Sequence, residues 1–222
     1  MTSTNEKKID LKQSIDFIRI LIYAAIVGLG AGVLGTLFTF SVNYVTQLRT
    51  NYPWLIYFLP IGGIVIVLLY KLAKYKDAGT DLVINSIHSE PHLPVRIGPL
   101  IFISSVITHL FGGSAGREGA ALQIGGSVGS FVSKTFRLTE EDKKTLIMSG
   151  CFSALFGTPL TAAILPLEVV HVGYMEYAAL LPCAIASLVG HSVAIAMNLV
   201  EPMHHIGTVP NLDAITTLAV IG

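Results

Sequence analysis

The stretch GGSAGREGAALQIGGSVG, residues 112–129, places Arg117 and Glu118 side by side among glycines and small apolar residues. A charged side chain near the centre of a bilayer costs at least about 2.5–3.5 kcal/mol, so an arginine–glutamate pair between long uncharged segments indicates a functional site. Glycines let backbone amides crowd a small anion at a helix start, where unpaired N–H groups and the helix dipole favour negative charge. We therefore expect an anion site here, for which the carboxylate of Glu118 competes.

The composition is that of an integral membrane protein rather than a soluble domain. Of 222 residues, 52% are hydrophobic and 13% are charged, about half the charged fraction of soluble domains. The 14 acidic residues balance the 14 lysines and arginines, so the charge gives no reason to expect nucleic acid as a partner. Cys151 and Cys183 lie in apolar surroundings, and we expect small buried side chains there, with no disulfide, metal or cofactor.

Five segments without a charged residue are each long enough to cross about 30 Å of hydrocarbon as a helix. They are residues 21–48, 50–70, 97–116, 145–167 and 177–200. The first cannot be a cleaved signal peptide, because its apolar run is much longer than the ~7–15 residues typical of one. The sequence therefore predicts an all-α, multi-pass protein of the cell membrane.

Basic residues at the ends of the first two segments predict their orientation. Those before the first segment are Lys7, Lys8, Lys12 and Arg19, and those after the second are Lys71, Lys74 and Lys76. By the positive-inside rule, both ends lie in the cytoplasm. We expect residues 1–19 to form a cytoplasmic N-terminal segment and the first two membrane segments to form a hairpin.

After Lys76 the pattern is no longer that of simple spanning helices. The sequence of residues 77–88 predicts a helix that is too short and too polar to cross the membrane. We expect Thr139, followed three residues later by Asp142, to cap another helix, and FGTPL at 156–160 to interrupt an apolar run. Broken helices at membrane depth are tolerated where protein buries the backbone or where it lines a wet cavity, so these breaks predict a substrate site near the midplane.

GREGA at 116–120, the small-residue helix after it and FGTPLTAAILPLEVV at 156–170 resemble the CLC family of anion channels and anion/proton exchangers. The resemblance covers the first inverted-topology half of that fold, with its broken, re-entrant helices, at residues 20–200. It implies that Glu118 is the gate, a tethered carboxylate that occupies the anion path, swings away when protonated and carries the exchanged proton. It also implies a homodimer in the lipid membrane and anion contacts from Gly116, Arg117, Gly119 and Ala120.

The chain departs from the family pattern at the first anion-binding motif. The family's Gly-Ser-Gly-Ile-Pro should lie near residues 77–83, where this chain reads DAGTDLV. No serine or proline is present, and Ala78, Gly79 or Thr80 could stand at the serine position. This departure puts chloride selectivity in doubt.

A second departure concerns the inner proton relay. The family's chloride/proton exchangers carry two adjacent acids at the end of the 159–170 helix, whereas here Glu168 is followed by Val169. Both departures, together with Gln123, resemble the bacterial branch that expels fluoride in exchange for protons. We therefore expect fluoride, or else chloride, to move with protons, and a chloride channel is the alternative.

The resemblance covers one of the family's two halves. Residues 201–222 look like a connection and the beginning of a second half, whose Gly-x-Phe-x-Pro helix start and pore tyrosine have no counterpart here. Helix starts from both halves converge on the anion in this family. We therefore expect the 222 residues to transport nothing alone and to need the missing C-terminal half.

Two other motifs suggest enzymes or nucleotide binding. Residues 30–35 satisfy GxGxxG but lie inside an apolar span with no strand before it, so close helix packing by Gly28 and Gly32 explains the glycines better. Residues 112–116 satisfy GxSxG, which with His109, His171 or His191 would suggest an intramembrane serine hydrolase using Ser114. The chain lacks the strand–turn–helix that a hydrolase elbow needs, and a rhomboid-like site favours glycine where Ala115 stands.

The histidines and the Arg117–Glu118 pair could also have purely structural roles. Lone histidines in apolar segments are more often hydrogen-bonded interior residues than bases, and Glu201, His204 and His205 have only weakly metal-like spacing, so we expect no metal. Arg117 and Glu118 could merely neutralise each other as a structural ion pair. Adjacent residues on a helix do not face each other, which weakens that account.

Overall fold

The structure, a computed structural model, describes residues 2–74, 81–88, 93–153, 161, 164 and 179–197. Every element in these ranges is helical, as the apolar segments predict. The elements are α1 (Thr2–Asn51), the 3₁₀ helix η1 (Pro53–Phe58), α2 (Leu59–Leu72), α3 (Asp81–His88), α4 (Ile97–Leu110), α5 (Arg117–Thr135), α6 (Glu140–Ser153) and α8 (Leu180–Ala196).

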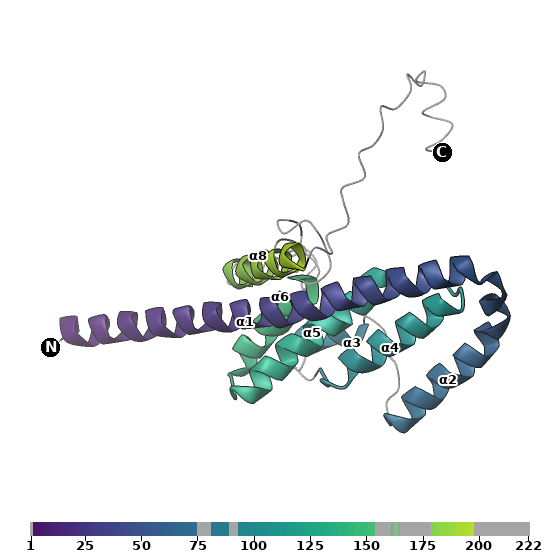
Figure 1. Cartoon of the computed structure of the whole chain (residues 1–222). Helices are drawn as coiled ribbons and strands as arrows, with labels where there is room; N and C mark the ends of the chain where they lie inside the picture. Colours follow the sequence, from purple (N-terminus) through teal and green to yellow (C-terminus); the bar gives the residue numbers. More distant parts are fainter. Residues whose placement is uncertain are drawn as a thin grey trace, which may run out of the picture.

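The long helix α1 is the axis of the described body (Figure 1). It contacts α4, α5, α6 and α8, and it continues without a break across the expected boundary at residue 20. At 1.5 Å per residue, its 37 residues from Ile15 to Asn51 extend about 55 Å, well beyond the thickness of a bilayer core. Ile15–Asn51 and Pro53–Leu72 are both long and apolar enough to cross a membrane.

The chain reverses direction after α1, as the expected hairpin requires. Tyr52 and Pro53 end α1 and start η1, and α2 then runs back (Figure 1). α2 diverges from α1 and packs against α4. Its apolar side chains, including Ile64 and Leu68, are exposed, the reverse of what water favours and the pattern expected of a surface that faces lipid or another membrane segment.

Glycine and alanine allow α1 and α8 to approach closely. A Cβ at Gly28 would lie 2.8 Å from Ala186 Cα, and a Cβ at Gly32 would lie 2.8 Å from Gly190 Cα. These distances are far below an ordinary carbon contact, so no larger residue fits without moving a backbone. The predicted packing role of Gly28 and Gly32 is confirmed, and the GxGxxG segment lies within α1 with no strand before it.

Small residues also set the position of α5 between its neighbours. A Cβ at Gly129 would lie 2.8 Å from Ile147 Cα on α6, and a Cβ at Gly98 on α4 would lie 3.2 Å from Ser127 Cβ. Eleven residues of α5 are buried, although glycine and serine are poor helix formers. Tertiary packing rather than helix propensity therefore stabilises α5.

Candidate functional site

The turn that leads into α5 is built by the end of α4. Gly112 has φ +84°, a left-handed conformation that favours glycine. Its N–H donates to His109 O at 3.2 Å, and the N–H of Gly113 donates to Thr108 O at 2.9 Å. This is the Schellman arrangement, which satisfies the last carbonyls of α4 and turns the chain sharply. α4 therefore ends at Leu110, just before the glycines, and not at the end of the charge-free segment at residue 116.

The start of α5 presents its backbone amides without a side-chain cap. Gly116 is the N-cap, with extended backbone at φ −63° and ψ 124°, and no side chain bonds to the helix start. The first N–H groups of a helix have no acceptor within the helix. A Cβ at Gly116 would meet nothing within 4 Å, so the described part of the chain leaves room for a side chain at the N-cap itself.

The four residues after Gly116 form the first turn of α5 and differ in burial. Glu118 is exposed, Arg117 and Gly119 are half-buried, and Ala120 is buried in the main apolar cluster. None of the described ion pairs joins Arg117 to Glu118, in agreement with the geometric argument against a simple neutralising pair. Glu118 therefore lies at the positive end of the helix dipole with its carboxyl group accessible.

The other half of the expected anion site is described only in part. Ala78, Gly79 and Thr80 lie outside the described residues, as do Glu168 and the FGTPL segment. The short helix predicted to follow Asp77 is confirmed as α3, from Asp81. Val83 of α3 is buried in the same apolar cluster as Ala120 and Ile124 of α5, which holds α3 beside the first turns of α5.

The helix cap predicted after α5 is confirmed. The N–H of Asp142 donates to Thr139 Oγ1 at 3.3 Å, at the start of α6. α5 itself ends in a second Schellman arrangement, with Arg137 rather than glycine in the left-handed conformation at φ 51°. The C-terminal ends of α4 and α5 are thus both closed by defined turns, whereas the start of α5 is uncapped.

The structure does not assemble a hydrolase around Ser114. Ser114 is exposed in the non-helical segment before α5, and no strand leads into it. His109 Nδ1 is bonded to Ser105 O at 2.7 Å, as expected of an interior histidine. Cys183 is a free, buried thiol, and the described residues include no group of three side chains that could hold a metal.

One cation beside the site was not predicted from the sequence. Arg49, in the last turn of α1, lies over the Gly112 turn, with Cδ 3.2 Å and Nη1 3.5 Å from the position of a Gly112 Cβ. No sequence motif joins Arg49 to Gly112, because the contact follows from the packing of distant segments. It places a second arginine on the turn that leads to Gly116.

Comparisons with known proteins identify the relatives of this fold. The sequence model of the voltage gated chloride channel family matches residues 62–222. A chloride/fluoride channel protein of Pseudomonas syringae pv. tomato is 39% identical over 206 residues, which are 90% of this chain and 46% of that protein. The H(+)/Cl(-) exchange transporter ClcA of Vibrio campbellii is 29% identical, over 67% of this chain and 36% of its own.

Two solved structures share the fold. A CLC-type fluoride/proton antiporter matches with a TM-score of 0.81 and 29% identity, over 93% of this chain and 54% of that one. A slow cyanobacterial Cl-/H+ antiporter matches with a TM-score of 0.67 and 23% identity, over 83% of this chain and 47% of that one. The chain spans about half the length of these relatives. From its family match and its fold, the chain belongs to the voltage-gated chloride channel (CLC) family of membrane proteins.

Proposed function

We propose that this chain forms the first half of a transporter that exchanges fluoride, or else chloride, for protons across the cell membrane. Glu118 is its gating and proton-carrying group. The observation that carries the proposal is the start of α5, where no side chain caps the first amides and the Glu118 side chain is exposed in the first turn. The named relatives are channels, exchangers and antiporters rather than enzymes.

The helix start supplies the chemistry that an anion needs. Unpaired N–H groups from Gly116 to Gly119 donate to the anion, and the helix dipole adds positive potential. The Glu118 carboxylate competes for the same donors, and protonation removes its charge and releases it. Arg117 contributes positive potential beside this site. Anion entry and proton uptake are thereby coupled through one side chain.

Several features favour fluoride over chloride. The named function of the 39% identical relative includes both anions, and the solved structure with the 0.81 TM-score is a fluoride/proton antiporter. The DAGTDLV segment lacks the serine and proline of the chloride motif, Glu168 has no acidic neighbour, and Gln123 is buried on α5. A chloride channel of the same family is the alternative.

We further propose that transport needs the equivalent of the half that the relatives have and this sequence does not span. Ala78, Gly79 and Thr80 complete the anion site from the N-terminal half, and the other half supplies the opposing helix starts. The working protein is a homodimer in the lipid membrane with its N-terminus in the cytoplasm. The basic residues before α1 and after α2 support this orientation.

The test of this function measures proton and fluoride movement together in liposomes. The 222 residues are reconstituted alone and joined to the C-terminal half of the Pseudomonas syringae relative. We expect only background flux from the 222 residues alone, and coupled movement of fluoride and protons from the joined protein. A tenfold preference for fluoride over chloride corresponds to about 1.4 kcal/mol of differential binding. Equal or faster chloride movement would assign the protein to the chloride alternative, and flux from the 222 residues alone would refute the need for a second half.

Glu118→Gln in the joined protein tests the gate. Glutamine keeps the shape of the protonated acid but cannot release a proton, so proton coupling should be lost, whether anion flux persists uncoupled or stalls. Glu141→Gln is the matched control, because Glu141 is also an exposed acid in the first turn of a helix, α6. Proton coupling that survives in Glu118→Gln, or disappears equally in Glu141→Gln, would refute the gate assignment.

A further inference from the structure

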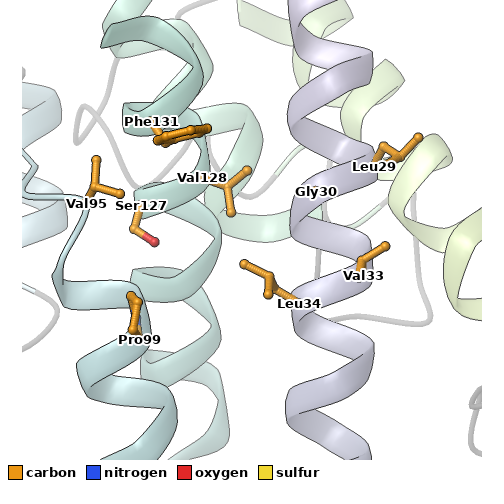
Figure 2. Close-up of a pocket in the computed structure, with 9 residues that line it drawn as sticks. All are labelled: Leu29, Gly30, Val33, Leu34, Val95, Pro99, Ser127, Val128 and Phe131. Atoms are coloured by element: carbon orange, nitrogen blue, oxygen red, sulfur yellow. The ribbon is translucent and has the colours of Figure 1, made fainter. Parts of the chain in front are cut away.

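A groove between helices of the described body has no part in the proposed anion path. It lies between α1 on one side and α4 and α5 on the other, with a volume of about 430 Å³. Figure 2 shows Leu34 of α1 and Val128 of α5 reaching toward each other across it, with Pro99 of α4 on the wall. Its volume is in the range of small-molecule sites, about 300–1,000 Å³.

The wall of the groove is apolar and opens outward. Leu29, Leu34 and Phe131 on its rim are 56%, 39% and 56% exposed. Among the described lining residues the one side-chain hydroxyl, Ser127 Oγ, already donates its proton to Ile124 O at 2.7 Å. The lining therefore favours a hydrocarbon for the part of the ligand that lies in the groove.

One end of the groove is positively charged. Val95 on its wall is followed by Arg96, which is exposed at the start of α4. Lys134 of α5, one turn after Phe131, extends its Nζ to 3.3 Å from Leu93 O, and Ser130 Oγ donates to the same carbonyl at 2.5 Å. These contacts hold the Lys134 ammonium beside the segment that leads into Val95 and Arg96.

None of the ion pairs among the described residues joins a carboxylate to Arg96 or Lys134. At the start of α6, Glu140 pairs with Lys143, and Asp142 lies 3.9 Å from Arg19. Both acids are thus engaged by other basic residues. An apolar groove that ends at Arg96 and Lys134 matches a molecule with a hydrocarbon chain and an anionic head.

We propose that this groove binds an anionic phospholipid, with an acyl chain between α1 and α5 and the headgroup phosphate at Arg96 and Lys134. Basic pockets between membrane helices bind anionic headgroups by this chemistry. The site is separate from the start of α5, and its occupancy is measured without any assay of transport. Its failure and the failure of the proposed function are therefore distinguishable.

The test is native mass spectrometry of the 222-residue chain extracted in detergent and exposed to phosphatidylglycerol or phosphatidylcholine. We expect phosphatidylglycerol to remain bound in preference to phosphatidylcholine, by about fivefold for each cation engaged. Arg96→Gln removes one of the two cations and should therefore reduce this preference about fivefold. Lys71→Gln is the control, because Lys71 is an exposed lysine in the last turn of α2, away from the groove. Equal retention of the two lipids would overturn the proposal.

A second pair of variants tests the hydrocarbon part. Leu34→Trp fills the groove and should reduce bound phosphatidylglycerol several-fold, whereas Leu37→Trp, on the same helix and also 39% exposed, should not. A preference that Arg96→Gln removes but Leu34→Trp leaves intact would assign binding to surface charge alone and overturn the groove. If Leu34→Trp shifts the monomer–dimer ratio without loss of lipid, the groove is occupied by a second copy of the chain. If lipid is lost when the C-terminal half is joined, the groove is occupied by that half of the protein. Either result overturns the lipid assignment.

Discussion

The surroundings of three glycines, one of them at the contact between α1 and α8, predict a graded response to alanine. At Gly28 a Cβ would lie 2.8 Å from Ala186 Cα and 2.9 Å from the Ala186 carbonyl carbon, and both atoms belong to a backbone. At Gly30 the nearest atom is Val128 Cγ1, at 3.0 Å. At Gly63 of α2 a Cβ would meet nothing within 4 Å. The three sites thus differ in what must move.

The expected magnitudes follow from these distances. A carbon contact needs about 3.5–4.0 Å, so Gly28→Ala must separate α1 from α8 by about 1 Å, and a gap of that size forfeits up to about half of each neighbouring contact. Overpacking of this kind costs about 1–3 kcal/mol, against a gain of about 0.5–1 kcal/mol from replacing glycine in a helix. We expect Gly28→Ala to destabilise the fold, Gly30→Ala to be nearly neutral because a valine side chain can turn, and Gly63→Ala to be stabilising.

The assay is thermal unfolding of the three variants in one detergent, followed by fluorescence-detected size exclusion. For a chain of this size, 1 kcal/mol shifts the melting temperature by roughly 2–4 °C. The melting temperature should be highest for Gly63→Ala, intermediate for Gly30→Ala and lowest for Gly28→Ala. A Gly28→Ala protein as stable as Gly63→Ala would refute the close packing of α1 on α8.

Three further changes test the turns and bonds around α5, each by the same melting assay unless stated. Gly112→Ala should lower stability by about 1–2 kcal/mol because alanine is strained at φ +84°, while Arg137→Gly at φ 51° should not lower it. Ser130→Ala should cost about 0.5–1.5 kcal/mol, because the buried Leu93 carbonyl loses one bond but keeps that from Lys134, whereas Ser41→Ala, which loses an exposed bond to its own helix, should cost little. Ser114→Ala should leave ion transport by the joined protein unchanged, and peptide cleavage abolished by this change would favour a hydrolase.

Much of the helical framework could be predicted because its signals are local. The glycines at 112 and 113, the cap at Thr139 and the uncharged run of α1 each specify a helix end or a span through neighbouring residues. Gly28 and Gly32 indicated a close helix contact, since their spacing puts both on one face. The start of α5 could be placed for the same reason, because Gly116 and the charged pair after it stand directly before a small-residue helix.

The partners of these elements could not be predicted in the same way. Gly28 does not specify Ala186 as its neighbour, and Arg49 carries no sign that it lies over Gly112. These contacts join residues more than sixty positions apart, and helical periodicity reports only which face is buried. The left-handed conformation of Arg137 is likewise hidden, because the residue type that favours it is glycine. The groove beside Val95 arises from three helices together and has no signal in any one of them.

The packing of α5 constrains how its first turn can work. Gly129 abuts the backbone of α6, Ser127 abuts Gly98 of α4, and Val128 abuts Gly30 of α1, so α5 is held from three directions by contacts that leave no room to slide. In the anion site that we propose, its amides would be fixed donors that need no rearrangement, which is the arrangement that makes backbone dipoles effective. The Glu118 side chain, by contrast, is exposed and free of described ion pairs. A gate built on this helix must work by rotation and protonation of that side chain rather than by movement of the helix that carries it.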